Sequence, residues 1–84
     1  MNVPPQFNTC LGNIIRANRK VAGLNQTQLA DDAGLTRRFI QELENGRSDI
    51  SMQTLYKLSR AMGTTLEVIS RQIEECLAAD PGVL

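Results

Sequence analysis

The sequence predicts an all-α fold of five helices, and two observations carry that prediction. Apolar residues recur three and four positions apart through most of the chain, whereas no stretch alternates strictly between apolar and polar residues as a half-buried strand does. Asn, Thr or Ser precedes most of these amphipathic stretches, and Gly follows most of them, as at helix boundaries. The 84 residues leave room for a single domain, 1–84, with a modest core.

The first two helices are delimited by their caps. The first is expected over about 9–21 and ends before Gly23. The second begins at Asn25, whose side chain can cap the free amides while Gln28 reaches back to complete a capping box, and it ends at Gly34. The apolar residues expected to be buried by the first helix are Leu11, Ile14, Ile15 and Val21.

The remaining three helices follow the same logic. Thr36 caps a third helix over 37–45, and Ser51 caps a fourth that runs through Met62. Thr64 and Glu67 form a second capping box for the last helix, a long one over about 65–79 that residues 80–82 break.

The second and third helices are joined by only three residues, which predicts a helix-turn-helix over 26–45. Two helices crossing steeply over so short a turn need a small side chain where they touch, which Ala30 supplies. The turn needs a positive φ, which Gly34 supplies. Ile40 and Leu43 lie three apart on one face of the third helix and can pack inward.

The opposite face of the third helix is left free for a ligand. It carries Arg37, Arg38 and Gln41, with Asn45 at its end. Phe39 is expected to pack against the core, as an aromatic residue at this spacing usually does.

The stretch "LNQTQLADDAGLTRRFIQELENG", residues 24–46, resembles the helix-turn-helix of the lambdoid phage repressor and Cro class, also called the XRE family. The resemblance covers about residues 11–69 and includes the small, glycine and apolar positions together with "LNQ" and "LENG". It implies a five-helix, lambda-repressor-like DNA-binding domain whose second motif helix enters the major groove of double-stranded DNA.

The resemblance also implies roles for individual residues. Arg37 and Arg38 take the leading base-contacting positions, where an Arg fork suits guanine, and Gln41 and Glu42 lie one turn further along. Glu42 departs from the Gln or Ser often found there, and its carboxylate would repel phosphate. Arg19 and Glu44 are implied to form a structural ion pair. The backbone-contacting positions are implied or expected to be Asn25, Gln26, Lys20, Arg16, Asn45 and Arg47.

The charge distribution is compatible with this partner although the net charge is zero. Residues 1–47 carry six basic and four acidic side chains, a net charge of +2, and residues 48–84 carry three basic and five acidic ones, a net charge of −2. The chain has no run of about 18 apolar residues and no secretion signal at its start. We therefore expect a cytoplasmic protein, neither membrane-bound nor secreted.

Composition argues against catalysis and against a metal site. The chain has no His, which removes the commonest general base and zinc ligand, so neither an enzyme nor a cofactor is predicted. The two cysteines, Cys10 and Cys76, lie near opposite ends of the chain in neither a disulfide framework nor a ligand spacing, and both are expected to be reduced packing residues.

The last predicted helix carries an apolar stripe longer than a four-helix core requires. We expect it to be a dimerisation helix, because regulators of this type read palindromes, with folding back onto the first helix and Phe7 as the alternative. The stripe comprises Leu66, Ile69, Ile73, Cys76 and Leu77.

The prediction is therefore a homodimeric transcription regulator, either a repressor or a controller protein like those of restriction-modification systems, that binds a palindromic operator. The alternative is an antitoxin that binds a toxin protein and autoregulates its promoter, because "RRFIQELENG" also resembles antitoxin components.

Overall fold

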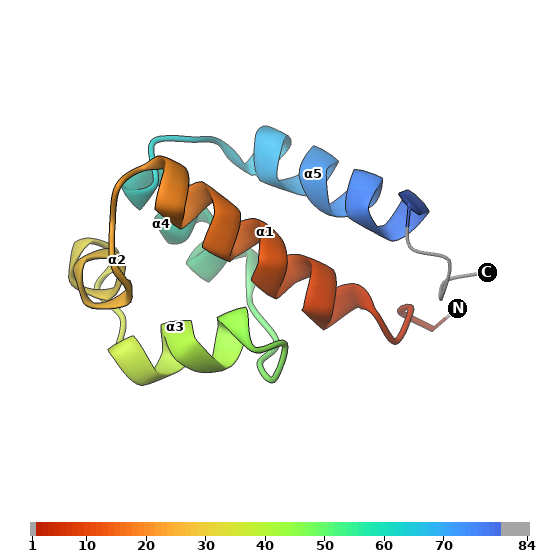
Figure 1. Ribbon diagram of the computed structural model, residues 1–84, viewed down its shortest axis with the longest axis horizontal. Helices are drawn as coiled ribbons and strands as arrows, with labels where there is room; N and C mark the ends of the chain where they lie inside the picture. Colours follow the sequence, from red (N-terminus) through yellow and green to blue (C-terminus); the bar gives the residue numbers. More distant parts are fainter. Residues whose placement is uncertain (1, 80–84) are drawn as a thin grey trace.

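The computed structural model describes residues 2–79, and that part of the chain contains five helices without strands, which confirms the all-α prediction (Figure 1). The helices are α1 (Phe7–Val21), α2 (Gln26–Ala33), α3 (Arg37–Glu44), α4 (Met52–Ala61) and α5 (Leu66–Ala79). None of them is long and apolar enough to cross a membrane. The predicted breakers at 80–82 lie outside the described residues.

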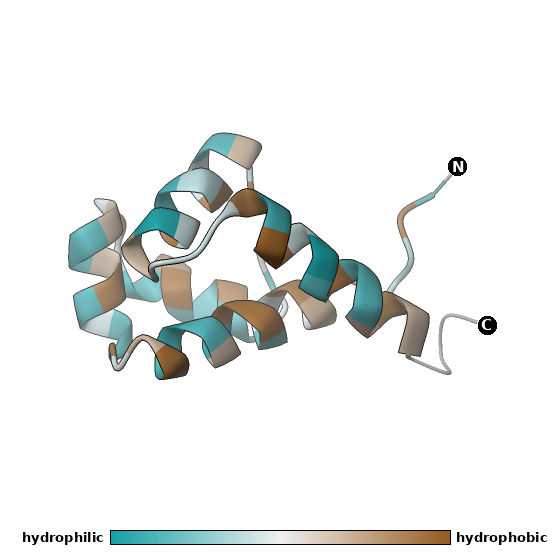
Figure 2. Ribbon diagram, turned by 90° about the horizontal axis from the view of Figure 1, so that it is seen from above, coloured by the Kyte–Doolittle hydropathy of each residue, from teal (hydrophilic) through white to brown (hydrophobic). Residues whose placement is uncertain are grey.

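The core lies where α1 meets its neighbours. α1 packs between α3 on one side and α5 on the other, while α2 packs against α3 and α4 (Figure 1). The helices carry both hydrophobic and hydrophilic residues (Figure 2), as expected for helices buried on one face. The largest fully buried apolar side chains are Leu11, Ile15, Leu29, Ile40, Leu43, Leu58 and Ile69.

Most predicted caps are present. Asn25 and Gln28 form the reciprocal capping box of α2, and the side chains of Thr36 and Ser51 accept from Phe39 and Thr54 amides at the starts of α3 and α4. α1 begins two residues earlier than expected, at Phe7, because the Phe7 amide donates to the Pro4 carbonyl and the turn at the prolines leads directly into the helix.

The cap predicted for α5 is wrong by one residue. Thr65 rather than Thr64 accepts the hydrogen bond, from the amide of Val68 at 3.2 Å. Glu67 therefore lies within the first turn and cannot close a capping box with Thr64. It pairs instead with Arg71 one turn further along, at 2.9 Å.

The two cysteines are not the reduced packing residues that the sequence predicts. Cys10 near the start of α1 and Cys76 near the end of α5 form a disulfide with their Cα atoms 5.9 Å apart. They lie 66 positions apart in the sequence, and they meet because α5 runs back along α1 toward the N-terminus (Figure 1). Only the helix arrangement reveals this proximity.

The apolar stripe of α5 is divided among three surroundings rather than forming one dimer surface. Ile69 and Ile73 are 0% and 6% exposed within the chain's own core, so the expectation that they face a partner is corrected. Cys76 is bonded to Cys10. Leu66 and Leu77 remain partly exposed at opposite ends of the helix, about 16 Å apart at the usual helical rise. Folding back onto α1, the alternative, accounts for the middle of the stripe.

Candidate nucleic-acid interface

The two helices of the motif meet as their residues predict. Ala30 is fully buried where α2 approaches α3, and Gly34 between them has φ of 69°, a conformation that side chains rarely adopt. The amide of Leu35 closes the turn by donating to the Ala30 carbonyl at 2.8 Å. These contacts fix the direction in which α3 leaves α2.

α3 is buried on one face and exposed on the other. Ile40 and Leu43 are fully buried, and Phe39 packs partly buried against the same core. Arg37, Arg38 and Gln41 are exposed, whereas Glu42, predicted beside them, is partly buried. At the end of α3, Asn45 is exposed at the C-cap, and Arg47 is exposed in the following turn. The solvent-facing surface of α3 therefore begins with two neighbouring guanidinium groups.

A shallow polar hollow lies beside the start of α3. It is lined by Asn25, Gln26 and Thr27 at the N-terminus of α2, together with Arg19 and Arg37. Helix N-termini present free amides and a positive dipole end, which favours anions. The hollow thus brings together three residues predicted to contact DNA, which are Asn25, Gln26 and Arg37, and it adds Thr27, which was not predicted. Lys20 is exposed at the end of α1, outside the lining of this hollow.

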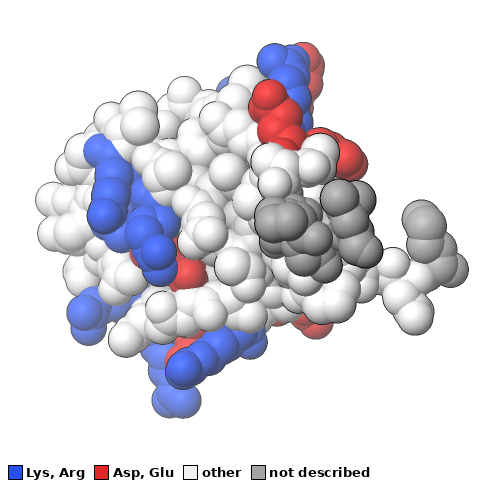
Figure 3. All heavy atoms as spheres, turned by 45° about the vertical axis from the view of Figure 1, so that its right-hand side comes forward, with Lys and Arg blue, Asp and Glu red and all other residues white. Residues whose placement is uncertain are grey.

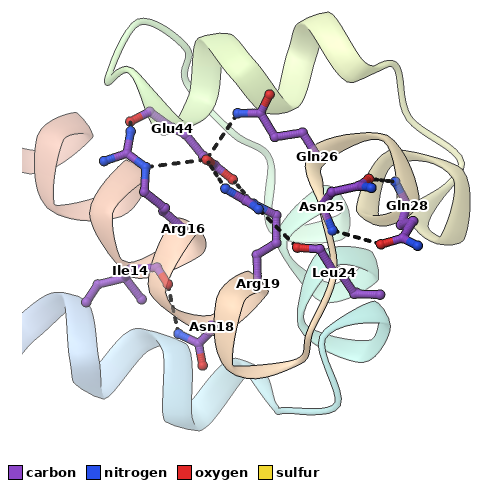
Figure 4. A network of polar contacts seen from close by, with 9 residues as sticks. All are labelled: Ile14, Arg16, Asn18, Arg19, Leu24, Asn25, Gln26, Gln28 and Glu44. Atoms are coloured by element: carbon purple, nitrogen blue, oxygen red, sulfur yellow. Dashed lines mark hydrogen bonds and ion pairs between the residues drawn. The ribbon is translucent and has the colours of Figure 1, made fainter.

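Glu44 is the buried polar centre behind this surface (Figure 4). Its side chain is 1% exposed and accepts two hydrogen bonds from Arg19, from Nε at 2.6 Å and from Nη2 at 2.9 Å. The ion pair that the resemblance implied is therefore present. Arg19 also donates to the Leu24 carbonyl at 3.0 Å, which attaches the segment before α2 to α1.

Gln26 and Arg16 complete the shell around Glu44. The Gln26 amide donates to Oε1 at 3.2 Å. Arg16 donates to the Glu44 backbone carbonyl at 2.9 Å and lies 3.4 Å from Oε1. A buried carboxylate requires compensating charge, and the Arg16 guanidinium supplies part of it while its side chain stays 39% exposed. Its expected role as a DNA backbone contact stays a prediction.

The same contacts set the ionisation of Glu44. Burial raises the pKa of its carboxyl, but hydrogen bonds from Arg19 and Gln26 and the charges of Arg19 and Arg16 outweigh burial, so the pKa lies below its ordinary value. The hydrogen bond to Glu44 raises the pKa of Arg19 in turn. Glu44 is therefore ionised at neutral pH and links α1, α2 and α3.

Gly12 allows the close approach of α1 and α3 that this cluster needs. A Cβ at Gly12 would lie 2.5 Å from the Leu43 carbonyl oxygen and 2.8 Å from that of Glu44. This role of Gly12 was not predicted from the sequence. The signal was a glycine inside an amphipathic helix, where it costs about 1 kcal/mol relative to Ala unless packing requires it.

Positive charge dominates part of the surface. In the view of Figure 3, Lys and Arg side chains are most prominent at the lower left, whereas Asp and Glu gather mainly at the upper right. This separation agrees with the polarity of the sequence and favours binding of a polyanion on one side of the molecule.

Comparison with known proteins gives a consistent assignment. The helix-turn-helix family HTH_3 matches residues 15–69. An HTH-type transcriptional regulator of Methanothermobacter thermautotrophicus is 42% identical over 50 residues, 60% of this chain and 72% of that protein. Control protein C.SmaI of Serratia marcescens is 32% identical over 63 residues, 74% of this chain and 75% of that protein.

A solved structure supports the fold. The clp gene regulator ClgR from Corynebacterium glutamicum superimposes with a TM-score of 0.83 at 24% identity, covering 90% of this chain and 81% of that one. With the family match over residues 15–69, the chain belongs to the HTH_3, XRE-type family of helix-turn-helix DNA-binding transcription regulators.

Proposed function

We propose that the protein is a sequence-specific transcription regulator that binds a palindromic operator as a homodimer, with α3 in the major groove. The observation that carries this proposal is the outer face of α3. Arg37 and Arg38 stand exposed in its first turn, and Gln41 lies one turn later, while the inner face is fixed in the core. Arg in this position can donate to O6 and N7 of guanine together.

The polar hollow beside α3 supplies a place for a backbone phosphate. Asn25 uses its side-chain oxygen to cap α2, so its remaining polar group is the amide nitrogen, a donor. Gln26 is held by Glu44, which limits its rotamers before DNA arrives. A phosphate in the hollow would fix the register of α3 without reading sequence. Lys20, Asn45 and Arg47 are proposed as further backbone contacts.

A small apolar surface at the junction of α4 and α5 supports a homodimer. Met52 and Tyr56 are 62% and 48% exposed, and together with Leu66 they line an open, largely apolar hollow. Exposed apolar side chains gathered in this way commonly mark a protein contact. A palindromic operator read by such a dimer would have half-sites about one helical turn, or 34 Å, apart. Leu66 is the residue of the predicted stripe that this interface retains. No observation favours the toxin-binding alternative.

Selection of binding sites from random duplexes with the purified protein, followed by titration of selected and random DNA, tests the proposal. Arg37→Ala and Arg38→Ala should each weaken operator binding by about 1 to 3 kcal/mol and random DNA much less, because a base contact is specific. Arg71→Ala is the control, because this exposed side chain pairs with Glu67 on α5. Selection that yields no consensus, or equal losses on both duplexes, would reject base reading by α3.

Salt dependence separates the phosphate contacts from the base contacts. Gln26→Ala should weaken operator and random DNA by similar factors and leave the salt slope unchanged, because a neutral amide releases no counterion. Lys20→Ala or Arg47→Ala should lower that slope by about one if the residue neutralises a phosphate. An unchanged slope would remove that residue from the interface.

A further inference from the structure

The Cys10–Cys76 disulfide is a covalent link that DNA recognition does not use. It joins the first turn of α1 to the last turn of α5, and these are the two cysteines of the sequence. Transcription regulation takes place in the compartment that holds the DNA. Disulfides are rare in compartments where thiols are kept reduced, and those that form there are mostly transient or redox-sensing. A disulfide in this protein is therefore expected to form and break with the redox state.

We propose that Cys10 and Cys76 form a reversible thiol-redox site, in which Cys76 reacts with small thiols and hydroperoxides and Cys10 is the resolving partner. Their surroundings differ. Cys10 is 2% exposed, inside the core. Cys76 is partly exposed and lines an open groove between α1 and α5, whose other lining residues include Ile14, Ala17 and Gln72. Because Cys76 is the cysteine that borders this open groove, we assign attack by a small reagent to its sulfur.

The exchange chemistry balances in both directions. In reduction, an external thiolate attacks the sulfur of Cys76, the S–S bond breaks, and Cys10 leaves as a thiolate that takes up a proton. A second external thiolate then attacks the external sulfur of this mixed disulfide, and Cys76 leaves as a thiolate that takes up a proton. The two external thiols depart as one disulfide, and both cysteines are reduced.

In oxidation, the Cys76 thiolate attacks a hydroperoxide, forming an S–O bond as the O–O bond breaks and an alcohol leaves. The Cys10 sulfur then attacks the sulfenic acid, forming the disulfide and releasing water.

The disulfide holds the last turns of α5, where the inward side chains are less buried than those of Ile69 and Ile73. Beyond Ile73, the side chains that α5 directs inward are Cys76 and Leu77, both only partly buried. The Asn18–Gln72 hydrogen bond at 2.7 Å lies one turn before Cys76. A bridge that closes a loop of this length restricts the unfolded chain strongly. Oxidation thus joins α5 covalently to α1 and raises the melting temperature of the protein. At temperatures between the Tm of the reduced form and the Tm of the oxidised form, only the oxidised regulator is folded.

The first experiment compares the full chain treated with hydrogen peroxide and with a phosphine reductant. Alkylation and intact mass should count no free thiol in the oxidised protein and two in the reduced one. Reduction should lower Tm by about 10 to 25 °C, as expected for a bridge of this loop length in a domain of this size. Cys76→Ser should melt like the reduced parent, with or without reductant. Two free thiols after peroxide, or equal Tm values, would overturn the proposal.

The second experiment tests which sulfur reacts. Iodoacetamide should modify Cys76 in Cys10→Ala at least about tenfold faster than Cys10 in Cys76→Ser, because the buried thiol reacts only when the structure opens. Equal rates, or faster reaction at Cys10, would reject the assignment of Cys76 as the entry sulfur. Neither experiment involves DNA, so its failure would leave the proposed function untouched.

Discussion

At the scale of single residues, Glu44 has the largest effect on the rest of the structure. It is a buried carboxylate whose partners come from α1 and α2, so three helices depend on its charge. Replacing one member of a buried pair commonly costs about 3 to 5 kcal/mol, because the other charge is left uncompensated. Without Glu44, the charge of Arg19 would be uncompensated, although its side chain is only 11% exposed.

We therefore predict that Glu44→Gln loses about 3 to 5 kcal/mol of unfolding free energy at neutral pH. The pKa of Glu44 is lowered in the folded chain, so its contribution is complete above its unfolded pKa of about 4.3 and is lost as pH falls through the lower folded pKa. The parent should thus lose stability below about pH 5, and the variant should lose less. Urea unfolding from pH 7 to 2 measures both. Glu75→Gln, an exposed position on α5, is the control.

Gly12 gives a second prediction at this scale. Gly12→Ala should destabilise the protein by about 1 to 3 kcal/mol, because the added methyl would meet the carbonyl groups of Leu43 and Glu44, which are backbone and cannot rotate away. Asn13→Ala, at the exposed next position, should be neutral or slightly stabilising. Urea midpoints of the two variants decide the matter, and a Gly12→Ala protein as stable as its parent would show that α1 and α3 can separate without cost.

At the scale of secondary-structure elements, the helix ends show how well local chemistry specifies boundaries. Asn25, Thr36 and Ser51 are each followed by a helix at the expected residue, because their side-chain oxygens satisfy amides that would otherwise be free. The sequence predicts Thr64 as the cap of α5 through its spacing to Glu67. In the structure the adjacent Thr65 is the residue whose hydroxyl accepts from the Val68 amide.

The adjacent threonines provide a matched pair of variants. Thr65→Ala should lower the unfolding free energy by about 1 kcal/mol, as loss of an N-cap usually does. Thr64→Ala should change it by less than about 0.5 kcal/mol. Thermal melts of both proteins make the comparison. The reverse order of the two effects would restore the cap that the sequence predicted.

At the scale of the whole molecule, the surface left after folding decides how two copies can meet. Ile69 and Ile73 are buried in the core, and Cys76 is bonded to Cys10. An interface between two copies must therefore use other side chains. Substitution of a core residue such as Ile73 by Asp would unfold the chain and say nothing about assembly. Met52 and Tyr56 are exposed and can be changed without disturbing the core.

We predict that Met52→Asp and Tyr56→Asp shift the protein from dimer to monomer with little change in Tm, because a buried charge opposes association while the folded chain leaves both positions in solvent. Sedimentation equilibrium over a range of concentrations measures the shift. Val21→Asp is the matched control. Val21 is not buried as the sequence predicted but 89% exposed, and it lines the groove between α1 and α5. A parent that stays monomeric at every concentration would rule out the homodimer in solution.

The sequence by itself determined the presence of the five helices, the caps of α2, α3 and α4, and the helix-turn-helix. These features follow from local rules: apolar periodicity, capping oxygens and a glycine in a three-residue turn act over a few positions and do not depend on distant parts of the chain. The outward direction of Arg37 and Arg38 also followed, because burial of Ile40 and Leu43 fixes the rotation of α3. The Arg19–Glu44 pair was supplied by family resemblance, not by local rules.

Only the tertiary structure decided which apolar stripe is core and which charges are engaged. A stripe on α5 looks the same whether a second molecule or α1 covers it, and the antiparallel packing of α5 on α1 settled this for Ile69 and Ile73 while bringing Cys10 to Cys76. The hydrogen bonds from Arg16 and Gln26 to Glu44 likewise depend on how the helices pack against one another. These contacts join residues far apart in the chain, and their energies depend on burial, which a one-dimensional pattern does not contain.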